Sequence, residues 1–159
     1  STVVIDAGGT PDRAVEAMRP CRDMKAGGKL WCVLMLDTTA DADTLARYGT
    51  QLERFSDQAI ITATEQSRSG FLAASHNVLD GVKKCASFRL VANRDRAIEW
   101  AVTEAAPQDT VLIITGERGL TAQEQRTNLA RIEQCIEQAR GLAEQVVTDT
   151  KPKLSVFGL

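Results

Sequence analysis

Residues 2–22 read TVVIDAGGTPDRAVEAMRPCR and join an apolar run to a helical pattern through a short glycine-containing turn. The run Thr2–Asp6 is rich in β-branched residues, which favour strands. Thr10 suits a helix N-cap, and Pro11 suits the first helical position, where a missing N–H costs nothing. Asp12 would face the positive end of the helix dipole. The stretch therefore predicts a strand that turns directly into a helix.

The same alternation of strand and helix continues along the chain. Further strands are expected in near-continuous apolar runs at Lys29–Leu36, Gln58–Thr62, Ser87–Val91 and Thr110–Thr115. Helices are expected at Pro11–Arg22, Asp41–Phe55, Gly70–Lys84 and Arg94–Ala105. Continuous apolar runs are typical of strands that are covered on both faces. The predicted fold class is therefore α/β, a three-layer αβα sandwich with a mostly parallel sheet.

Composition narrows the range of functions. The chain has 159 residues, net charge −2 and no basic block, so we expect one domain and no nucleic-acid partner. Its apolar runs are too short to cross a membrane, and no signal peptide is visible, which favours a cytoplasmic location. Four scattered cysteines indicate reduced thiols. The single histidine, His76, excludes a multi-histidine metal site, and we expect no metal.

The turn formed by Gly8, Gly9 and Thr10 is the first candidate for a ligand site. Ligands of open α/β sheets bind at the carboxyl ends of strands, where glycines allow the backbone to approach closely. A plain turn before a capped helix is the alternative. The chain has no G-x-G-x-x-G, and Gly27–Lys29 precedes a strand instead of following one, unlike a P-loop. No phosphate-gripping loop is therefore identified in this chain.

Three stretches together resemble a known family. They are TVVIDAGGTPDRAVEAMRPCR at 2–22, FSDQAIITATEQSRSG at 55–70 and NRDRAIEWAVTEAAPQDTVLIITGERG at 93–119. In order and spacing they are similar to the C-terminal domain of the Mur ligases, most closely the UDP-N-acetylmuramoyl-tripeptide synthetase type. The resemblance runs from about Thr2 to Gly119 and implies a Rossmann-like domain.

The resemblance implies a role in ATP-dependent amide bond formation. Such ligases activate a carboxylate as an acyl phosphate, which the amine of an incoming amino acid attacks. Their C-terminal domain closes over a central ATP domain and helps to hold the amino acid. ATP and Mg would be bound only through that central domain, which this chain lacks, so this domain alone is expected to be non-catalytic. The implied partners are an amino acid and a nucleotide-linked muramoyl peptide in peptidoglycan precursor synthesis.

The family motifs are altered in this chain. In the first turn, Gly9 replaces the family's nucleotide-facing histidine, although backbone contact through Gly8, Gly9 and Thr10 remains possible. In the second motif, Asp41 and Asp43 match the family's two acids, the arginine between them is lost, and Arg47 falls near its Lys-Arg pair. Asp41 and Asp43 alternatively serve only as acids at a helix start.

The third and fourth motifs carry the remaining substrate-binding candidates. Glu65 and Arg68 fall in the third motif, where Arg68 matches the arginine that holds the amino acid's carboxylate, a task suited to a guanidinium. A solvated loop arginine is the alternative. Glu117 and Arg118 stand in a reordered version of the fourth motif, where Glu117 could bind an ammonium group. The altered motifs leave a second function open: a catalytically silent Mur-like domain for binding or assembly.

The last helix adds a possible partner surface. Thr121 to about Val147 lacks proline and carries apolar residues at heptad spacing. This stripe either packs on the sheet or mediates self-association, and it consists of Leu129, Ile132, Ile136, Ala139, Ala143 and Val146. The expected organisation is a Mur-like core over 1–119, a long helix over 120–148, and a tail over 149–159 that docks as an extended segment or stays loose.

Overall fold

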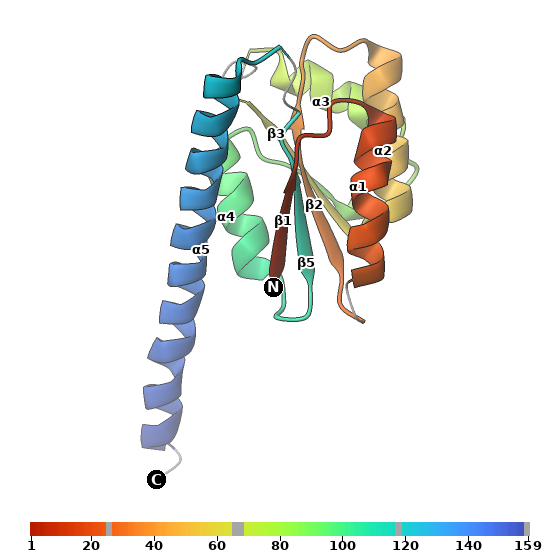
Figure 1. Cartoon of the computed structure of the whole chain (residues 1–159). Helices are drawn as coiled ribbons and strands as arrows, with labels where there is room; N and C mark the ends of the chain where they lie inside the picture. The colour runs from red at the N-terminus through yellow and green to blue at the C-terminus, as the bar shows by residue number, and fades with distance from the viewer. Residues whose placement is uncertain (25–26, 65–68, 117–118, 158–159) are drawn as a thin grey trace.

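The computed structural model describes residues 1–24, 27–64, 69–116 and 119–157, and side chains as far as residue 144. Within these ranges five parallel strands form one sheet in the order β1-β5-β2-β3-β4. They are β1 (Thr2–Asp6), β2 (Leu30–Leu36), β3 (Gln58–Ala63), β4 (Phe88–Leu90) and β5 (Thr110–Ile114). The last strand lies between the first two, so β1 and β4 form the edges of the sheet (Figure 1).

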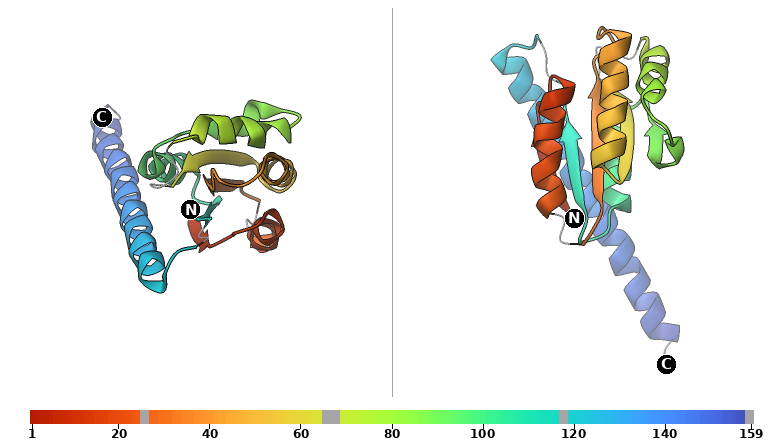
Figure 2. Two further views of the ribbon diagram at one scale, coloured as in Figure 1. Left: turned by 90° about the horizontal axis from the view of Figure 1, so that it is seen from above. Right: turned by 90° about the vertical axis from the view of Figure 1, so that its right-hand side faces the viewer.

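Helices cover both faces of the sheet, which confirms the predicted α/β sandwich (Figure 2). One layer holds α1 (Pro11–Met24), α2 (Ala42–Phe55) and α3 (Phe71–Asp80). The other holds α4 (Arg94–Glu104) and α5 (Ala122–Phe157), which pack mainly on each other. A 3₁₀ turn, η2 (Cys85–Ser87), leads into β4.

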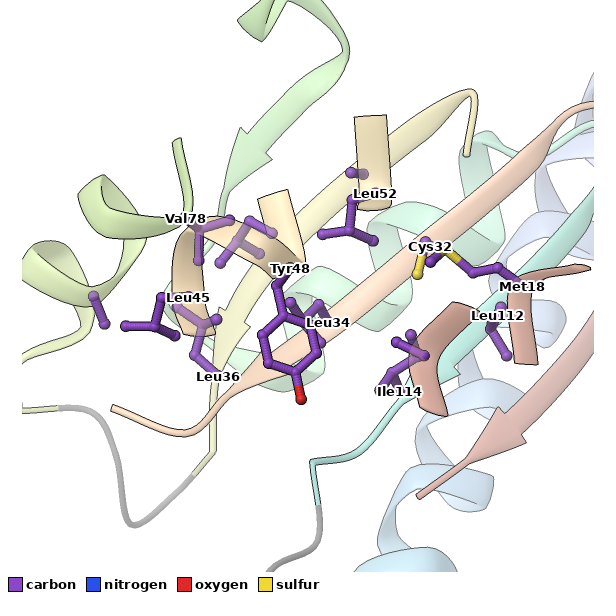
Figure 3. Packing of buried hydrophobic residues seen from close by; sticks show 14 of the residues in the cluster. Met18, Cys32, Leu34, Leu36, Leu45, Tyr48, Leu52, Val78, Leu112 and Ile114 are labelled. Carbon is purple, nitrogen blue, oxygen red and sulfur yellow. The ribbon is translucent and has the colours of Figure 1, made fainter. Parts of the chain in front are cut away.

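Alternate residues of the central strands face opposite layers. Leu34, Leu36, Leu112 and Ile114 point towards Tyr48 and the other apolar residues of α1, α2 and α3 (Figure 3). The intervening residues of β2 and β5 pack against α4 and α5. Every residue of β2 and β5 is buried, as the continuous apolar runs predicted.

The apolar stripe of α5 belongs to this second core. Ile132 and Ala139 are 0% exposed and Ile136 is 7% exposed. They lie in one cluster with strand residues and with α4, so at these three positions the stripe packs on its own domain, the first of the two alternatives. Leu129 remains 39% exposed and Ala143 is half-buried. The side chain of Val146 lies outside the described ones.

Two helix ends differ from the expected ones. The third helix ends at Asp80 and not near Lys84, because the N–H groups of Lys83 and Lys84 donate to the Glu53 carboxylate of α2 instead of to helical carbonyls. The last helix does not end near Val147 but continues to Phe157, so the expected tail is helical. Residues 142–157 contain no glycine, and Pro152 lies inside the helix and does not end it.

Candidate binding site at the carboxyl edge of the sheet

The carboxyl ends of the parallel strands meet at one edge, and the turns that follow them carry the predicted site residues. The chain leaves β1 and β2 towards the layer of α1 and α2 but leaves β5, which lies between them, towards α5 (Figure 1). Neighbouring strands whose connections diverge in this way open a crevice where ligands of α/β proteins bind. The edge near β1, β5 and β2 is therefore the candidate site.

The turn after β1 is fixed by a residue that the sequence analysis did not single out. The Oδ1 atom of Asp6 accepts a hydrogen bond of 2.8 Å from the N–H of Gly8. Gly8 has a φ of +65°, and a Cβ there would clash with Cγ2 of Ile114. Gly9 has a φ of +97°, with open space where a Cβ would lie. An aspartate just before two glycines, typical of an Asx turn, was the available signal for Asp6.

Thr10 caps α1 as predicted. Its Oγ1 accepts from the N–H of Arg13 at 3.2 Å, and its carbonyl accepts from the N–H of Ala14 at 3.0 Å. Pro11 is the first helical residue, also as predicted. The hydroxyl of Thr10 is therefore engaged by the helix. Contact of Gly8, Gly9 and Thr10 with a nucleotide stays a prediction.

The acids of the second motif serve the start of α2. Asp41 is its N-cap, and its Oδ1 accepts from the N–H of Thr44 at 2.7 Å. These hydrogen bonds from Thr44 lower the pKa of the Asp41 carboxyl. Asp43 lies in the first turn of the helix. Both positions agree with the helix-start interpretation, while substrate binding by either acid stays a prediction.

Arg47 links two helices at this edge. Its Nη2 lies 3.5 Å from Oδ1 of Asp12 in α1, with both side chains largely exposed, at 60% and 79%. An exposed ion pair of this kind contributes at most about 1 kcal/mol. Arg47 therefore keeps a solvent-accessible guanidinium near the first turn, which is compatible with its predicted role in substrate binding.

The turn after β5 contacts both of its neighbours. The N–H of Thr115 donates to the carbonyl of Asp6 at 2.9 Å, which continues the pairing of β5 with β1. A Cβ on Gly116 would lie 2.7 Å from the carbonyl oxygen of Met35 in β2. Thr115 is 2% exposed, and its hydroxyl has no hydrogen-bond partner. In the sequence Thr115 is predicted only as the last residue of a strand, since no pattern marks an unpaired hydroxyl.

Four predicted residues cannot be placed at this edge. Glu65 and Arg68, and likewise Glu117 and Arg118, lie outside the described residues. Their flanking residues are described: Thr64 follows β3, and Gly116 follows β5. The structure thus joins the turn after β1, which carries the first motif, to the turn after β5 through the hydrogen bond between Thr115 and Asp6.

The described part of the chain bears on the expectations for metal ligands and cysteines. No group of three or more His, Cys, Asp or Glu side chains there is arranged to hold a metal ion. The four cysteines are unpaired, and burial raises the pKa of the thiols of Cys21, Cys32 and Cys135. A raised pKa leaves little reactive thiolate at neutral pH. No helix within the described ranges combines the length and apolar character needed to span a membrane.

Comparison with known sequences identifies one family. The profile of the family described as Mur ligase, glutamate ligase domain, matches residues 1–118. A UDP-N-acetylmuramoyl-L-alanyl-D-glutamate–2,6-diaminopimelate ligase from Chromobacterium violaceum is 32% identical over 112 residues, covering 70% of this chain and 22% of that protein. The ligase of the same name from Acidovorax sp. is 32% identical over 114 residues, covering 70% and 23%. The chain thus spans less than a quarter of these relatives.

Solved structures agree on the fold. A UDP-N-acetylmuramoyl-L-alanyl-D-glutamate–2,6-diaminopimelate ligase matches 87% of this chain and 29% of its own, with a TM-score of 0.65 and 16% identity. A domain of a putative UDP-N-acetylmuramate:L-alanyl-gamma-D-glutamyl-meso-diaminopimelate ligase from Haemophilus ducreyi matches 86% of this chain and 89% of its own, with a TM-score of 0.55 and 17% identity. At these identities the likeness extends to the fold alone.

Proposed function

The chain belongs to the Mur ligase, glutamate ligase domain family, and on that basis we propose that it is the amino-acid-binding domain of an ATP-dependent Mur-type amide ligase. The reaction would join an amino acid to a nucleotide-linked muramoyl peptide in peptidoglycan precursor synthesis. The observation that carries the proposal is the family match over residues 1–118, which ends at the turn after β5. The strand order supports it, because β5 lies between β1 and β2 and ligands of α/β sheets bind where the connections diverge in this way.

The parts of the proposed site have separate tasks. The turn at Gly8 and Gly9 presents backbone to the nucleotide, with the Gly9 position open for close approach. Arg68 holds the carboxylate of the incoming amino acid, while Glu65, Glu117 and Arg118 line the same substrate. Asp41, Asp43 and Arg47 border it from α2. ATP and Mg are bound by a central domain of the ligase, since this chain contains no P-loop.

A diamino acid is the first substrate to test, because the two sequence relatives carry 2,6-diaminopimelate in their names. The natural gene product is first identified by intact mass, then incubated with ATP, Mg and UDP-N-acetylmuramoyl-dipeptide. Diaminopimelate, lysine and single-amine amino acids are supplied in turn. The proposal expects ADP release that depends on one amino acid, together with a ligated product of matching mass. No amino-acid-dependent ADP release with any of them would refute it.

Arg68→Ala tests the amino-acid role directly. We expect KM for the amino acid to rise by about tenfold to a hundredfold, the loss of one charged hydrogen-bonded contact, with KM for ATP unchanged. Arg54→Ala is the matched control, because Arg54 lies in the last turn of α2, at the opposite edge of the sheet. If both substitutions changed KM for the amino acid equally, Arg68 would not be the residue that binds its carboxylate.

A catalytically silent binding or assembly domain is the second candidate. The observation that favours it is the first turn, where Gly9 stands in place of the family's histidine and provides no ring to contact a nucleotide. This candidate expects an intact fold without amino-acid-dependent ADP release. Gly9→His separates the two: a ligase should change its KM for ATP, whereas a silent domain should show no turnover with either residue.

A further inference from the structure

A cleft of about 370 Å³ lies on the α5 side of the carboxyl edge. Its walls come from the end of β1 (Ile5 and Ala7) and from the first turns of α5. Thr115 completes the lining. Ile113, two residues before Thr115, packs with α4 and α5. Because side chains two residues apart in a strand lie on the same face, the Thr115 side chain also faces α4 and α5. The cleft thus lies across the sheet from Asp41, Asp43 and Arg47.

Thr115 is the unusual member of the lining. Its hydroxyl is buried and has no hydrogen-bond partner. Leaving such a group unpaired destabilises the fold, whereas a residue of the same shape without the hydroxyl would avoid this loss. A polar group that the fold does not satisfy, at a position that lines a cleft, points to a partner outside the chain.

The rest of the lining defines the chemistry of that partner. The walls are apolar, formed by Ile5, Ala7, Ala122 and Leu129. Gln125 and Arg126 supply the remaining polar groups, and Arg126 carries the only charge among the described lining residues. A guanidinium and a hydroxyl both donate to a carboxylate. Among the described lining residues there is no acidic side chain to accept an ammonium group.

We propose that this cleft binds a small carboxylate with a short apolar stem and no free amine. The stem lies between the end of β1 and the first turns of α5, and the carboxylate accepts from Thr115 and Arg126. Such a ligand differs from the zwitterionic amino acid of a ligase. The acids of α2, Asp41 and Asp43, do not line the cleft. The proposal does not rest on the proposed function.

The test uses 4-methylpentanoate and leucine, which differ only in the α-amino group. Each is titrated into the isotope-labelled chain, and binding is followed by NMR of the backbone amides. We expect saturable shifts at Ala7, Thr115, Gln125 and Arg126 with 4-methylpentanoate, at a Kd of about 1 mM. Leucine and the neutral 4-methylpentanamide should bind about tenfold more weakly, because the first carries an unpaired amine and the second lacks the charge.

Thr115→Val keeps the shape and removes the hydroxyl. The variant should be at least as stable as the parent and should bind 4-methylpentanoate about tenfold more weakly. Thr62→Val is the matched control: Thr62 is also buried with an unpaired hydroxyl, but it does not line the cleft. It should leave binding unchanged.

The contribution of the exposed arginine of the cleft is tested separately, because substituting an exposed residue should not affect folding. Arg126→Gln should weaken the binding of 4-methylpentanoate about tenfold. Arg131→Gln, on the same helix but outside this cleft, should leave binding unchanged. The proposal is overturned if no saturable shift occurs, if leucine binds as well as 4-methylpentanoate, or if Thr115→Val and Arg126→Gln bind it like the parent.

Discussion

At each end of the parallel strands, one aspartate carboxylate holds a turn in place. At the carboxyl edge, Asp6 fixes the turn at Gly8. At the amino edge, buried Asp109 accepts from the N–H groups of Lys29 and Ala106 at 2.8 and 2.9 Å, and from Nε1 of Trp31 at 2.9 Å. Burial opposes the charge of Asp109, but these three donors outweigh it and hold the pKa of the carboxyl below its usual range. One residue thereby joins the start of β2 to the turn before β5.

Asp109→Asn should lower the free energy of unfolding by about 2 kcal/mol at neutral pH, because an amide cannot accept from all three donors. The pKa of Asp109 is lower in the folded chain than in the unfolded one. Its stabilisation is therefore fully present above the unfolded value of about 3.9 and is lost as pH falls through the folded value. Urea titrations of parent and variant should differ at pH 7 and converge in acid.

Asp12→Asn is the control for this comparison. Asp12 is 79% exposed and its ion pair with Arg47 is long. Its substitution should change the unfolding free energy by no more than about 0.5 kcal/mol. A loss equal to that of Asp109→Asn would show that net charge, and not the buried hydrogen bonds, governs both variants.

At the scale of elements, close contact between two helices sets the layer over β2 and β3. A Cβ on Gly49 of α2 would clash with the carbonyl oxygen of Val78 in α3, and a Cβ on Gly81 would clash with that of Ala46. The helices therefore pack backbone to backbone at these two points. This contact also explains why α3 ends early, since the chain must leave the helix where Gly81 meets α2.

Gly49→Ala should lower the free energy of unfolding by about 1–3 kcal/mol, because the added methyl group forces α2 and α3 apart. Gly141→Ala provides the opposite case within α5, where a Cβ would meet nothing. It should raise stability by up to about 1 kcal/mol, the gain of alanine over glycine in a helix. Thermal unfolding of both variants measures the difference, and a shift of the same sign in both would contradict the close contact.

At the scale of the whole molecule, α5 completes the second layer of the sandwich. It begins level with the carboxyl ends of the strands and runs past the opposite end of the sheet (Figure 1). Ile132, Ile136 and Ala139 contribute to the core between α4 and the sheet, and Arg140 donates to the carbonyl of Ser1 at 3.1 Å. The helix therefore belongs to the fold of the domain, although the family match ends at residue 118.

Ile132→Ala should lower the free energy of unfolding by about 2–5 kcal/mol, the cost of a cavity at a fully buried isoleucine. Leu142→Ala on the same helix should change it by less than about 1 kcal/mol, because Leu142 is 46% exposed. Urea unfolding at several protein concentrations distinguishes this role from self-association. If the urea midpoint of the parent rose with protein concentration and that of Ile132→Ala did not, the stripe would be shown to mediate self-association.

The sequence by itself determined the strands, the order of the elements and the caps of α1 and α2, because continuous apolar runs, Thr10 and Asp41 act locally. It also determined the family, through motifs spread over residues 1–119. Tertiary structure decided the end of α3, the burial of the α5 stripe, the role of Asp109 and the unpaired hydroxyl of Thr115. Each of these depends on groups distant in sequence, and a heptad stripe looks the same whether its own sheet or another chain covers it.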